Sequence, residues 1–280
     1  MKKILVPTDF SKYSQYALEV AADIALKTNA EIMLLHANEK MVTATPLAEY
    51  YLYDKAIEDE YLDMVTESLK KTLTDIADNG KFARVRIQTA VIGGPMASVI
   101  EEVVKDHAID LIVMGTRGAS GLEEFLVGSN TEKIIRRAKC PVLAVPIAVK
   151  SFSKIVFPTT LKDDQLKAFH TLASLQGIFN GDISLLYLNN PAHFENDEAI
   201  EAQKNQLVAM AGLKNATLYV SKQNVFNEED AILSFAHEHN ADLIVMATHQ
   251  RRGLAHLLVG SMTEDTVNHS DIPVLSISIK

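Results

Sequence analysis

The sequence predicts an α/β protein made of two tandem doubly wound domains, each with a five-stranded parallel sheet flanked by helices. Several segments of the first half recur, in the same order, in the second half. Within each half, short continuous apolar runs alternate with longer segments in which apolar residues return every three or four positions. Strands that alternate with helices form parallel sheets with right-handed crossovers. The 48% of hydrophobic residues is sufficient for packed cores.

The internal repeat defines the two domains. Three pairs of segments carry it: KILVPTDF at 3–10 with KIVFPTTL at 154–161, IDLIVMGT at 109–116 with ADLIVMAT at 241–248, and CPVLAV at 140–145 with IPVLSI at 272–277. The offset is 151 residues for the first pair and 132 for the other two, so the second copy is 19 residues shorter. The offset is still 151 between residues 30–38 and 181–189, so the missing residues fall between this second strand and the third. We expect domains at 1–148 and 153–280. Because no long polar linker separates them, we expect them to pack together.

Each expected strand of the first domain is an apolar run that ends in turn-forming residues. These runs are residues 4–8, 31–37, 84–92, 111–115 and 141–145. The expected helices are 12–27, opened by Asp9 or Ser11 as N-cap, then 47–78, 96–107 and 129–138.

The second domain follows the same order. Its expected strands are 155–158, 183–188, 216–220, 243–246 and 274–277. Its expected helices are 164–179, 195–211, 229–240 and 261–269.

Composition and charge exclude several classes of protein. The net charge of −9 argues against a nucleic-acid binder, which usually presents a basic face. No apolar run approaches the ~18 residues that span a bilayer, and the N-terminal apolar run is too short for a secretory signal. A single cysteine allows no internal disulfide, which is typical of the cytoplasm. We therefore expect a cytoplasmic protein without nucleic-acid or membrane partners.

A glycine-rich loop follows the fourth strand of the first domain. Its pattern is G-x2-G-x9-G-S, at Gly115, Gly118, Gly128 and Ser129. Ligands of doubly wound sheets bind beyond the carboxyl ends of the strands, and glycine lets a ligand approach the backbone closely. The loop ends where a helix begins, and free N–H groups at a helix start favour an anion. The spacing is not that of a Walker loop or of G-x-G-x-x-G; tight turns and helix ends are the structural alternative.

This loop, with ILVPTDFS at the start and CPVLAVP at the end of the copy, resembles the universal stress protein family. The resemblance covers nearly the whole chain as two tandem copies and implies five-stranded sheets of order 3-2-1-4-5. Many family members bind ATP through this glycine motif, and others lack the motif and do not. It implies a site for ATP or ADP, alone or with Mg²⁺, in the first domain. The implied site residues are Pro7, Thr8, Asp9, Ala37, Met114, Gly115, Gly118, Gly128, Ser129 and Asn130.

The resemblance implies which portion of the nucleotide each of these residues would contact. Asp9 would hold the ribose hydroxyls, with helix capping as its alternative role. Pro7, Thr8 and the backbone of Ala37 would border adenine, and Met114 and Gly115 the sugar. Gly118, Gly128, Ser129 and Asn130 would surround the phosphates. Ala37 replaces a valine that is common in the family, a change that a backbone contact tolerates.

The second domain departs from the pattern. Thr160 replaces Asp9, Ala247 replaces Gly115 and Gln250 replaces Gly118. We therefore predict that this domain binds ATP weakly or not at all. Three positions of the motif remain: Gly253, Gly260 and Ser261. Arg251 and Arg252 precede them and are more simply interpreted as solvated surface residues than as an anion site.

Other conspicuous residues favour structural roles. His249 and His256 lack the accompanying motifs of a zinc site, so we expect no metal. Cys140 has no evident base partner and is interpreted as a packed thiol. Four tyrosines in the longer segment of the first domain are expected to pack on the core, with a partner surface as the alternative: Tyr50, Tyr51, Tyr53 and Tyr61.

The last strand of each copy suggests why the domain is duplicated. An uncovered edge strand promotes aggregation, and in the family this strand pairs across a dimer axis. Two copies on one chain can make that contact internally, and a further homodimer is compatible with this. The predicted function is that of an ATP- or ADP-binding stress-response regulator, with a slow ATPase or a nucleotide-free scaffold as alternatives. Glu123 and Glu124 fit a helix surface better than a general base, so no catalytic residue is predicted.

Overall fold

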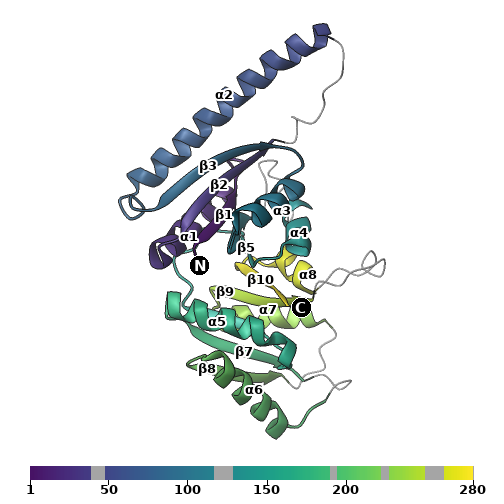
Figure 1. The fold of residues 1–280 in the computed structure, drawn as a ribbon. Coiled ribbons are helices and arrows are strands. Elements are labelled where there is room, and N and C mark those ends of the chain that lie inside the picture. The colour runs from purple at the N-terminus through teal and green to yellow at the C-terminus, as the bar shows by residue number, and fades with distance from the viewer. Residues whose placement is uncertain (39–47, 117–128, 190–193, 222–226, 250–261, 280) are drawn as a thin grey trace.

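The computed structural model describes residues 1–38, 48–116, 129–189, 194–221, 227–249 and 262–279. Ten strands form one sheet, in the order β3-β2-β1-β4-β5-β10-β9-β6-β7-β8 (Figure 1). Each half of this sheet therefore has the predicted order 3-2-1-4-5. The strands of the first domain are β1 (Lys3–Pro7), β2 (Glu31–Asn38), β3 (Arg86–Gly93), β4 (Leu111–Gly115) and β5 (Val142–Val145). Those of the second domain are β6 (Lys154–Pro158), β7 (Asp182–Leu188), β8 (Ala216–Ser221), β9 (Leu243–His249) and β10 (Val274–Ile279).

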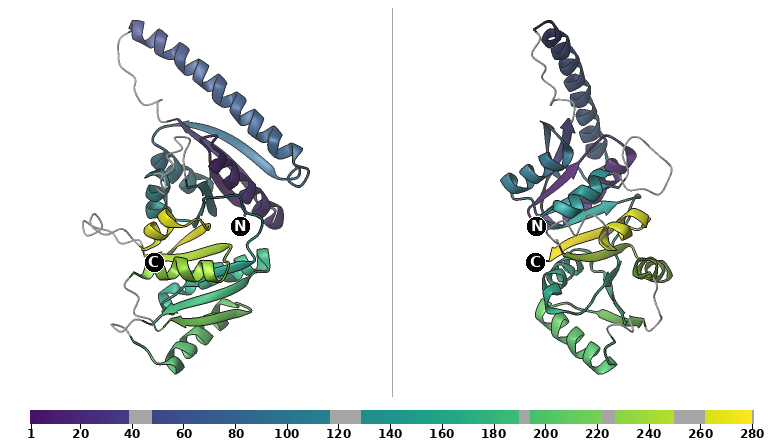
Figure 2. Two further views of the ribbon diagram at one scale, coloured as in Figure 1. Left: turned by 180° about the vertical axis from the view of Figure 1, so that it is seen from behind. Right: turned by 90° about the vertical axis from the view of Figure 1, so that its right-hand side faces the viewer.

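Helices cover both faces of the sheet (Figure 2). One hydrophobic cluster packs against α1 (Lys12–Thr28), α2 (Ala48–Asp78), α5 (Leu166–Phe179) and α6 (Asp197–Ala211). The other packs against α3 (Met96–His107), α4 (Ser129–Arg137), α7 (Glu228–Glu238) and α8 (Met262–His269). Ile4 and Val6 of β1 belong to the first cluster and Leu5 to the second. This alternation is why the strands read as continuous apolar runs, since both faces are buried.

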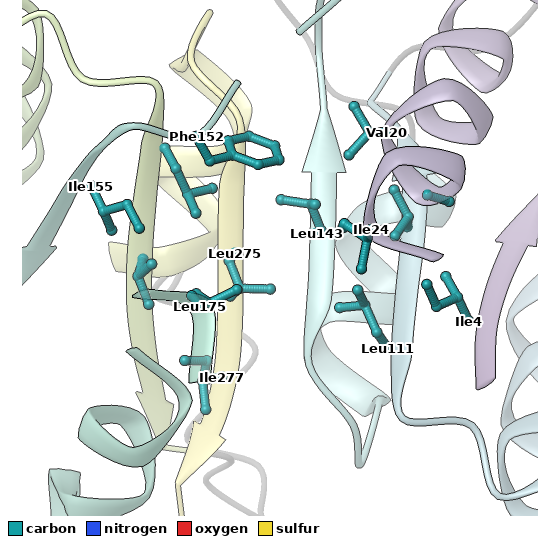
Figure 3. Close-up of a cluster of buried hydrophobic side chains, with 14 of the residues drawn as sticks. Ile4, Val20, Ile24, Leu111, Leu143, Phe152, Ile155, Leu175, Leu275 and Ile277 are labelled. Carbon is teal, nitrogen blue, oxygen red and sulfur yellow. The ribbon is translucent and has the colours of Figure 1, made fainter. Parts of the chain in front are cut away.

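The two halves of the sheet meet at β5 and β10, which pair antiparallel with Leu143 opposite Leu275. Figure 3 shows both side chains within one hydrophobic cluster that also includes Ile24 of α1 and Ile277 of β10. Burying one such side chain contributes about 1.5–3 kcal/mol. The prediction that the last strands of the two copies pair within the chain is confirmed.

The extra length of the first domain lies in α2, where the repeat placed it. This helix has 31 residues, whereas its counterpart α6 has 15. It extends beyond the edge of the sheet (Figure 1). On the described part of α2, Val65, Leu69 and Ile76 are buried and Met64 is exposed, so one face of the helix packs on the core.

Several element ends differ from expectation for identifiable reasons. The strand expected at 243–246 continues to His249 because that residue pairs with Ile279 of β10. The helix expected from residue 164 begins with a 3₁₀ turn, Asp163–Gln165, before α5. No helix in the described ranges is both long and apolar enough to cross a membrane.

Candidate functional site

The carboxyl ends of β2, β1 and β4 lie side by side in the first domain. From β1 the chain winds to β2 on one side and later returns to β4 on the other. The direction of winding thus reverses between β1 and β4, which is where doubly wound sheets bind ligands. The turn after β1 and the start of α4 both belong to this edge.

The turn after β1 holds Asp9 by its own hydrogen bond. Oδ1 of Asp9 accepts from the backbone N–H of Ser11 at 3.0 Å, and the side chain is half-buried. The N-cap of α1 is Ser11, whose Oγ accepts from the N–H of Ser14 at 3.3 Å. Of the two residues proposed from the sequence as N-cap, Ser11 therefore fills that role. Asp9 instead closes the turn that precedes the helix.

Three residues that sequence reasoning did not assign to this edge pack against the turn after β1: His36, Tyr61 and Phe10. Nδ1 of the buried His36 lies 2.9 Å from the carbonyl oxygen of Thr8. Since a carbonyl only accepts, Nδ1 carries the proton and donates it. In the neutral ring Nε2 then accepts from the hydroxyl of Tyr61, 2.8 Å away on α2. The ring of Phe10, which has φ 63°, stacks on His36 at 4.9 Å.

This arrangement decides the role of Tyr61. Its hydroxyl ties α2 to β2 and to the turn after β1, so the packing role favoured from the sequence is confirmed for this tyrosine. The side chains of Tyr50, Tyr51 and Tyr53 lie outside the described part of the chain. A histidine inside a buried strand was the available signal for His36, but its partners are 28 and 25 residues away.

Gly115 at the end of β4 has a steric reason to be glycine. A Cβ at this position would lie 2.7 Å from the backbone carbon of Tyr13 in the first turn of α1. The carbonyl oxygen of Gly115 accepts from the hydroxyl of Thr131 in α4 at 3.2 Å. Gly115 thus holds the starts of α1 and α4 close together at this edge.

The remaining residues implied by the resemblance are distributed as follows. Pro7 ends β1 and is buried, and Ala37 is half-buried near the end of β2. Met114 is buried in the hydrophobic cluster beneath α3 and α4, so its side chain belongs to the core. Asn130 is partly exposed in the first turn of α4. Gly118, Gly128 and the side chain of Ser129 lie outside the described residues, as do Glu123 and Glu124.

The second domain builds the corresponding turn differently. Gln165 occupies the position of Ser14, by the 151-residue offset, and is buried. Its Oε1 accepts from the hydroxyl of Thr159 at 2.6 Å and from the N–H of Thr160 at 3.0 Å. A side-chain amide from the helix therefore closes this turn, and Thr160 is exposed. Sequence reasoning compared Thr160 with Asp9 but overlooked Gln165.

The rest of the second motif contributes little to the described structure. Ala247 is half-buried in β9. Seven of the positions named from the sequence lie outside the described residues: Gln250, Arg251, Arg252, Gly253, His256, Gly260 and Ser261. Among the described residues, no group of three His, Cys, Asp or Glu side chains is arranged to hold a metal ion.

Cys140 has the character of a packed thiol. It is half-buried before β5, and burial raises the pKa of the thiol to about 11. A thiol with so high a pKa is almost entirely protonated at neutral pH and is a poor nucleophile.

Comparison with known proteins identifies the family. The model of the universal stress protein family matches the chain twice, over residues 1–146 and 151–278. The chain belongs to the universal stress protein family. It is a tandem member with two copies of the family domain.

Relatives in this family match either one copy or the whole chain. Universal stress protein YxiE of Bacillus subtilis is 32% identical over 147 residues, covering 51% of this chain and 97% of its own length. Universal stress protein Slr1230 of Synechocystis is 25% identical over 298 residues and covers 99% of both chains. A universal stress protein from Archaeoglobus fulgidus has a similar fold, with a TM-score of 0.71 and 18% identity, covering 99% of this chain and 96% of its own.

Proposed function

We propose that the first domain binds ATP or ADP at the carboxyl edge of β1, β2 and β4, and that occupancy of this site regulates the protein in a stress response. The observation that carries the proposal is the Asp9 carboxylate, held by the Ser11 N–H at the point where the winding of the sheet reverses. A carboxylate in this position can accept hydrogen bonds from the 2′- and 3′-hydroxyls of a ribose.

The remaining groups suit the rest of a nucleotide. Thr8 and Ala37 border the space beside Asp9 where we place the base. The free N–H groups in the first turn of α4 favour phosphate, and Ser129 and Asn130 begin that helix. We assign Gly118 and Gly128, which lie outside the described residues, to the phosphates on their spacing in the sequence. Whether Mg²⁺ accompanies the nucleotide is tested by titration with and without EDTA.

The proposal assigns no nucleotide to the second domain. The Gln165 side chain already occupies the acceptor role at the turn, through two hydrogen bonds, and Thr160 offers no carboxylate. The second domain instead contributes strand β10, which pairs with β5 of the first domain and joins the two halves of the sheet. The nucleotide would therefore act on a two-domain unit through one site.

Thermal unfolding of the full chain with ATP or ADP tests this proposal. A ligand at a hundred times its Kd adds about 2.7 kcal/mol to the free energy of unfolding, so the midpoint should rise. Asp9→Asn should abolish the rise, because asparagine can keep the hydrogen bond to Ser11 but lacks the charge. Thr160→Asn is the matched control and should respond like the wild type. The nucleotide-free wild type failing to respond would refute the proposal.

The test also separates the alternative functions. Multiple turnover of ATP that disappears in Asp9→Asn would indicate a slow ATPase. An unliganded protein that binds its partner equally well with and without ATP would indicate a scaffold.

The same proposal includes the location of the protein in the cell and the kind of partner that it has. A net charge of −9 and one cysteine favour a cytoplasmic protein whose partners are nucleotide and protein. Because β5 and β10 pair with each other, a homodimer would use a different surface. The molecular mass in solution, measured with and without ATP, shows whether the chain forms a homodimer.

A further inference from the structure

A cavity of about 260 Å³ lies between α3 and α4, at the edge of the sheet opposite to the proposed nucleotide site. Three buried isoleucines and the half-buried Cys140 form its apolar part: Ile100, Ile109 and Ile134. Ile109 precedes β4 and Cys140 precedes β5, which places the cavity at the amino ends of these strands. The helices α3 and α4 lie side by side (Figure 1).

The mouth of this cavity is positively charged. Three exposed cations, Lys105, Arg137 and Lys139, line it together with one acid, Glu101. None of the three cations forms an ion pair within the described part of the chain. This concentration of positive charge occurs in a chain whose net charge is −9. The helix dipoles favour cations in the last turns of α3 and α4, but Lys139 lies beyond the end of α4.

The second domain carries different side chains at the corresponding positions. With the 132-residue offset, Ala97 and Arg137 correspond to Glu229 and His269. Oε1 of Glu229 lies 2.5 Å from Nδ1 of His269, so an acid on α7 meets a ring nitrogen on α8. In the first domain, the small Ala97 leaves Arg137 without this partner.

A second pair of positions repeats the contrast. Lys105 and Lys139 correspond to His237 and Asp271. Nε2 of His237 lies 3.2 Å from Oδ1 of Asp271. In the first domain two lysines stand at these positions, and both line the cavity. The second domain therefore forms two acid–histidine contacts at these positions, whereas the first domain presents cations that line a cavity.

We propose that this cavity binds a small amphipathic carboxylate, an acyl or aryl acid. Its apolar part enters between α3 and α4, and its carboxylate is held by Lys105, Arg137 and Lys139. The volume of about 260 Å³ exceeds the roughly 150 Å³ of an apolar cavity that accepts benzene. An anionic head is favoured because three cations line the cavity beside a single acid, and charge-assisted hydrogen bonds to a carboxylate are stronger than neutral ones.

Sodium octanoate is the probe, added to the full chain labelled with ¹³C at the isoleucine δ1 methyls. We expect saturable shifts at Ile100, Ile109 and Ile134. Ile232 and Ile272, which occupy the positions of Ile100 and Cys140 in the second domain, should not shift. Shifts at all five methyls alike, or at none, would overturn the proposal. So would 1-octanol binding as tightly as octanoate, because the carboxylate would then contribute nothing.

Lys139→Asp tests the charge directly. It copies Asp271 and offers an acid to Lys105, so octanoate should bind about tenfold more weakly, the loss expected for one charge-assisted hydrogen bond. Lys70→Asp, at an exposed position of α2 that does not line the cavity, is the matched control for net charge and should bind like the wild type. Unchanged affinity in Lys139→Asp, with a dispersed methyl spectrum, would refute the assignment of the head group.

Discussion

Arg136 of α4 binds Glu264 of α8 through two hydrogen bonds, Nε to Oε1 at 3.0 Å and Nη2 to Oε2 at 2.6 Å. The pair joins the two domains beside the β5–β10 seam. The side chain of Glu264 is only 8% exposed, and its hydrogen bond raises the pKa of the Arg136 guanidinium. Arg136 also contacts Glu132 on its own helix, at 3.1 Å. One guanidinium therefore serves equivalent glutamates of both copies, since Glu132 and Glu264 are 132 residues apart.

Replacing Arg136 should destabilise the contact between the domains. Arg136→Gln leaves the buried Glu264 carboxylate without its cation, so we expect a loss of about 1–3 kcal/mol in the free energy of unfolding. Glu132→Gln removes only the exposed partner and should cost less than about 0.5 kcal/mol. Urea unfolding of both variants measures the difference. Equal losses would show that the contact between the domains adds nothing beyond a surface pair.

Adding a methyl group at Gly115 should destabilise the fold. In Gly115→Ala the Cβ would meet the backbone of Tyr13 at 2.7 Å, and we expect a cost of about 1–3 kcal/mol. Gly177→Ala is the control, because Gly177 is exposed in α5 with no atom within 4 Å of the added Cβ. It should gain about 0.5–1 kcal/mol from helix propensity. Denaturant midpoints of the two variants should move in opposite directions.

Removing the Tyr61 hydroxyl should loosen α2 at the turn after β1. In Tyr61→Phe the buried Nε2 of His36 loses its donor, at a cost of about 1–2 kcal/mol. Hydrogen exchange along α2 should also rise. Tyr16→Phe is the control, since no hydrogen bond of the Tyr16 hydroxyl occurs within the described residues, and it should stay within about 0.5 kcal/mol of the wild type. No difference between these variants would contradict a supporting role for His36.

Asp23 should stabilise the protein only above acidic pH. Burial alone would raise the pKa of Asp23, but hydrogen bonds from Lys81 and Lys27 outweigh it and hold the pKa below its usual value. A lowered pKa stabilises the folded state above the unfolded-state value of about 3.9, and that stability is lost as the pH falls through the folded-state pKa. Asp23→Asn should therefore cost about 0.5–1 kcal/mol at pH 7 and progressively less in acid.

Unfolding at a series of pH values measures this dependence. Asp63→Asn, at an exposed position of α2, is the control and should show no such trend. A penalty for Asp23→Asn that stays constant down to pH 3 would contradict the pairing with Lys27 and Lys81.

Local sequence signals predicted most of the fold. The run at 4–8 is continuously apolar, and such a run is typical of a strand that is buried on both faces. This pattern can be read from a few consecutive residues. The repeat placed the length difference before the third strand, and it lies in α2. The sequence also predicted which edge of the sheet the glycine loop follows, because β4 and the loop are consecutive in the chain.

The details of the site could not be obtained in this way. Asp9 and Ser11 are both good capping residues, and only the backbone geometry of the turn assigns the cap to Ser11. The contacts of His36 with Tyr61 and of Gly115 with Tyr13 join residues that are far apart in sequence. Gln165 closes its turn through a side-chain amide, a choice that no local pattern predicts.

The sequence by itself determined the two tandem α/β domains, their element order and the difference between their glycine motifs, because periodicity, turn residues and repetition are local properties. Only the tertiary structure decided that β5 and β10 join the domains in one sheet with a given register and that Arg136 reaches Glu264. It also decided that His237 contacts Asp271, whereas Lys105 and Lys139 at the corresponding positions line a cavity. Those outcomes depend on distances between residues that meet only after the chain has folded.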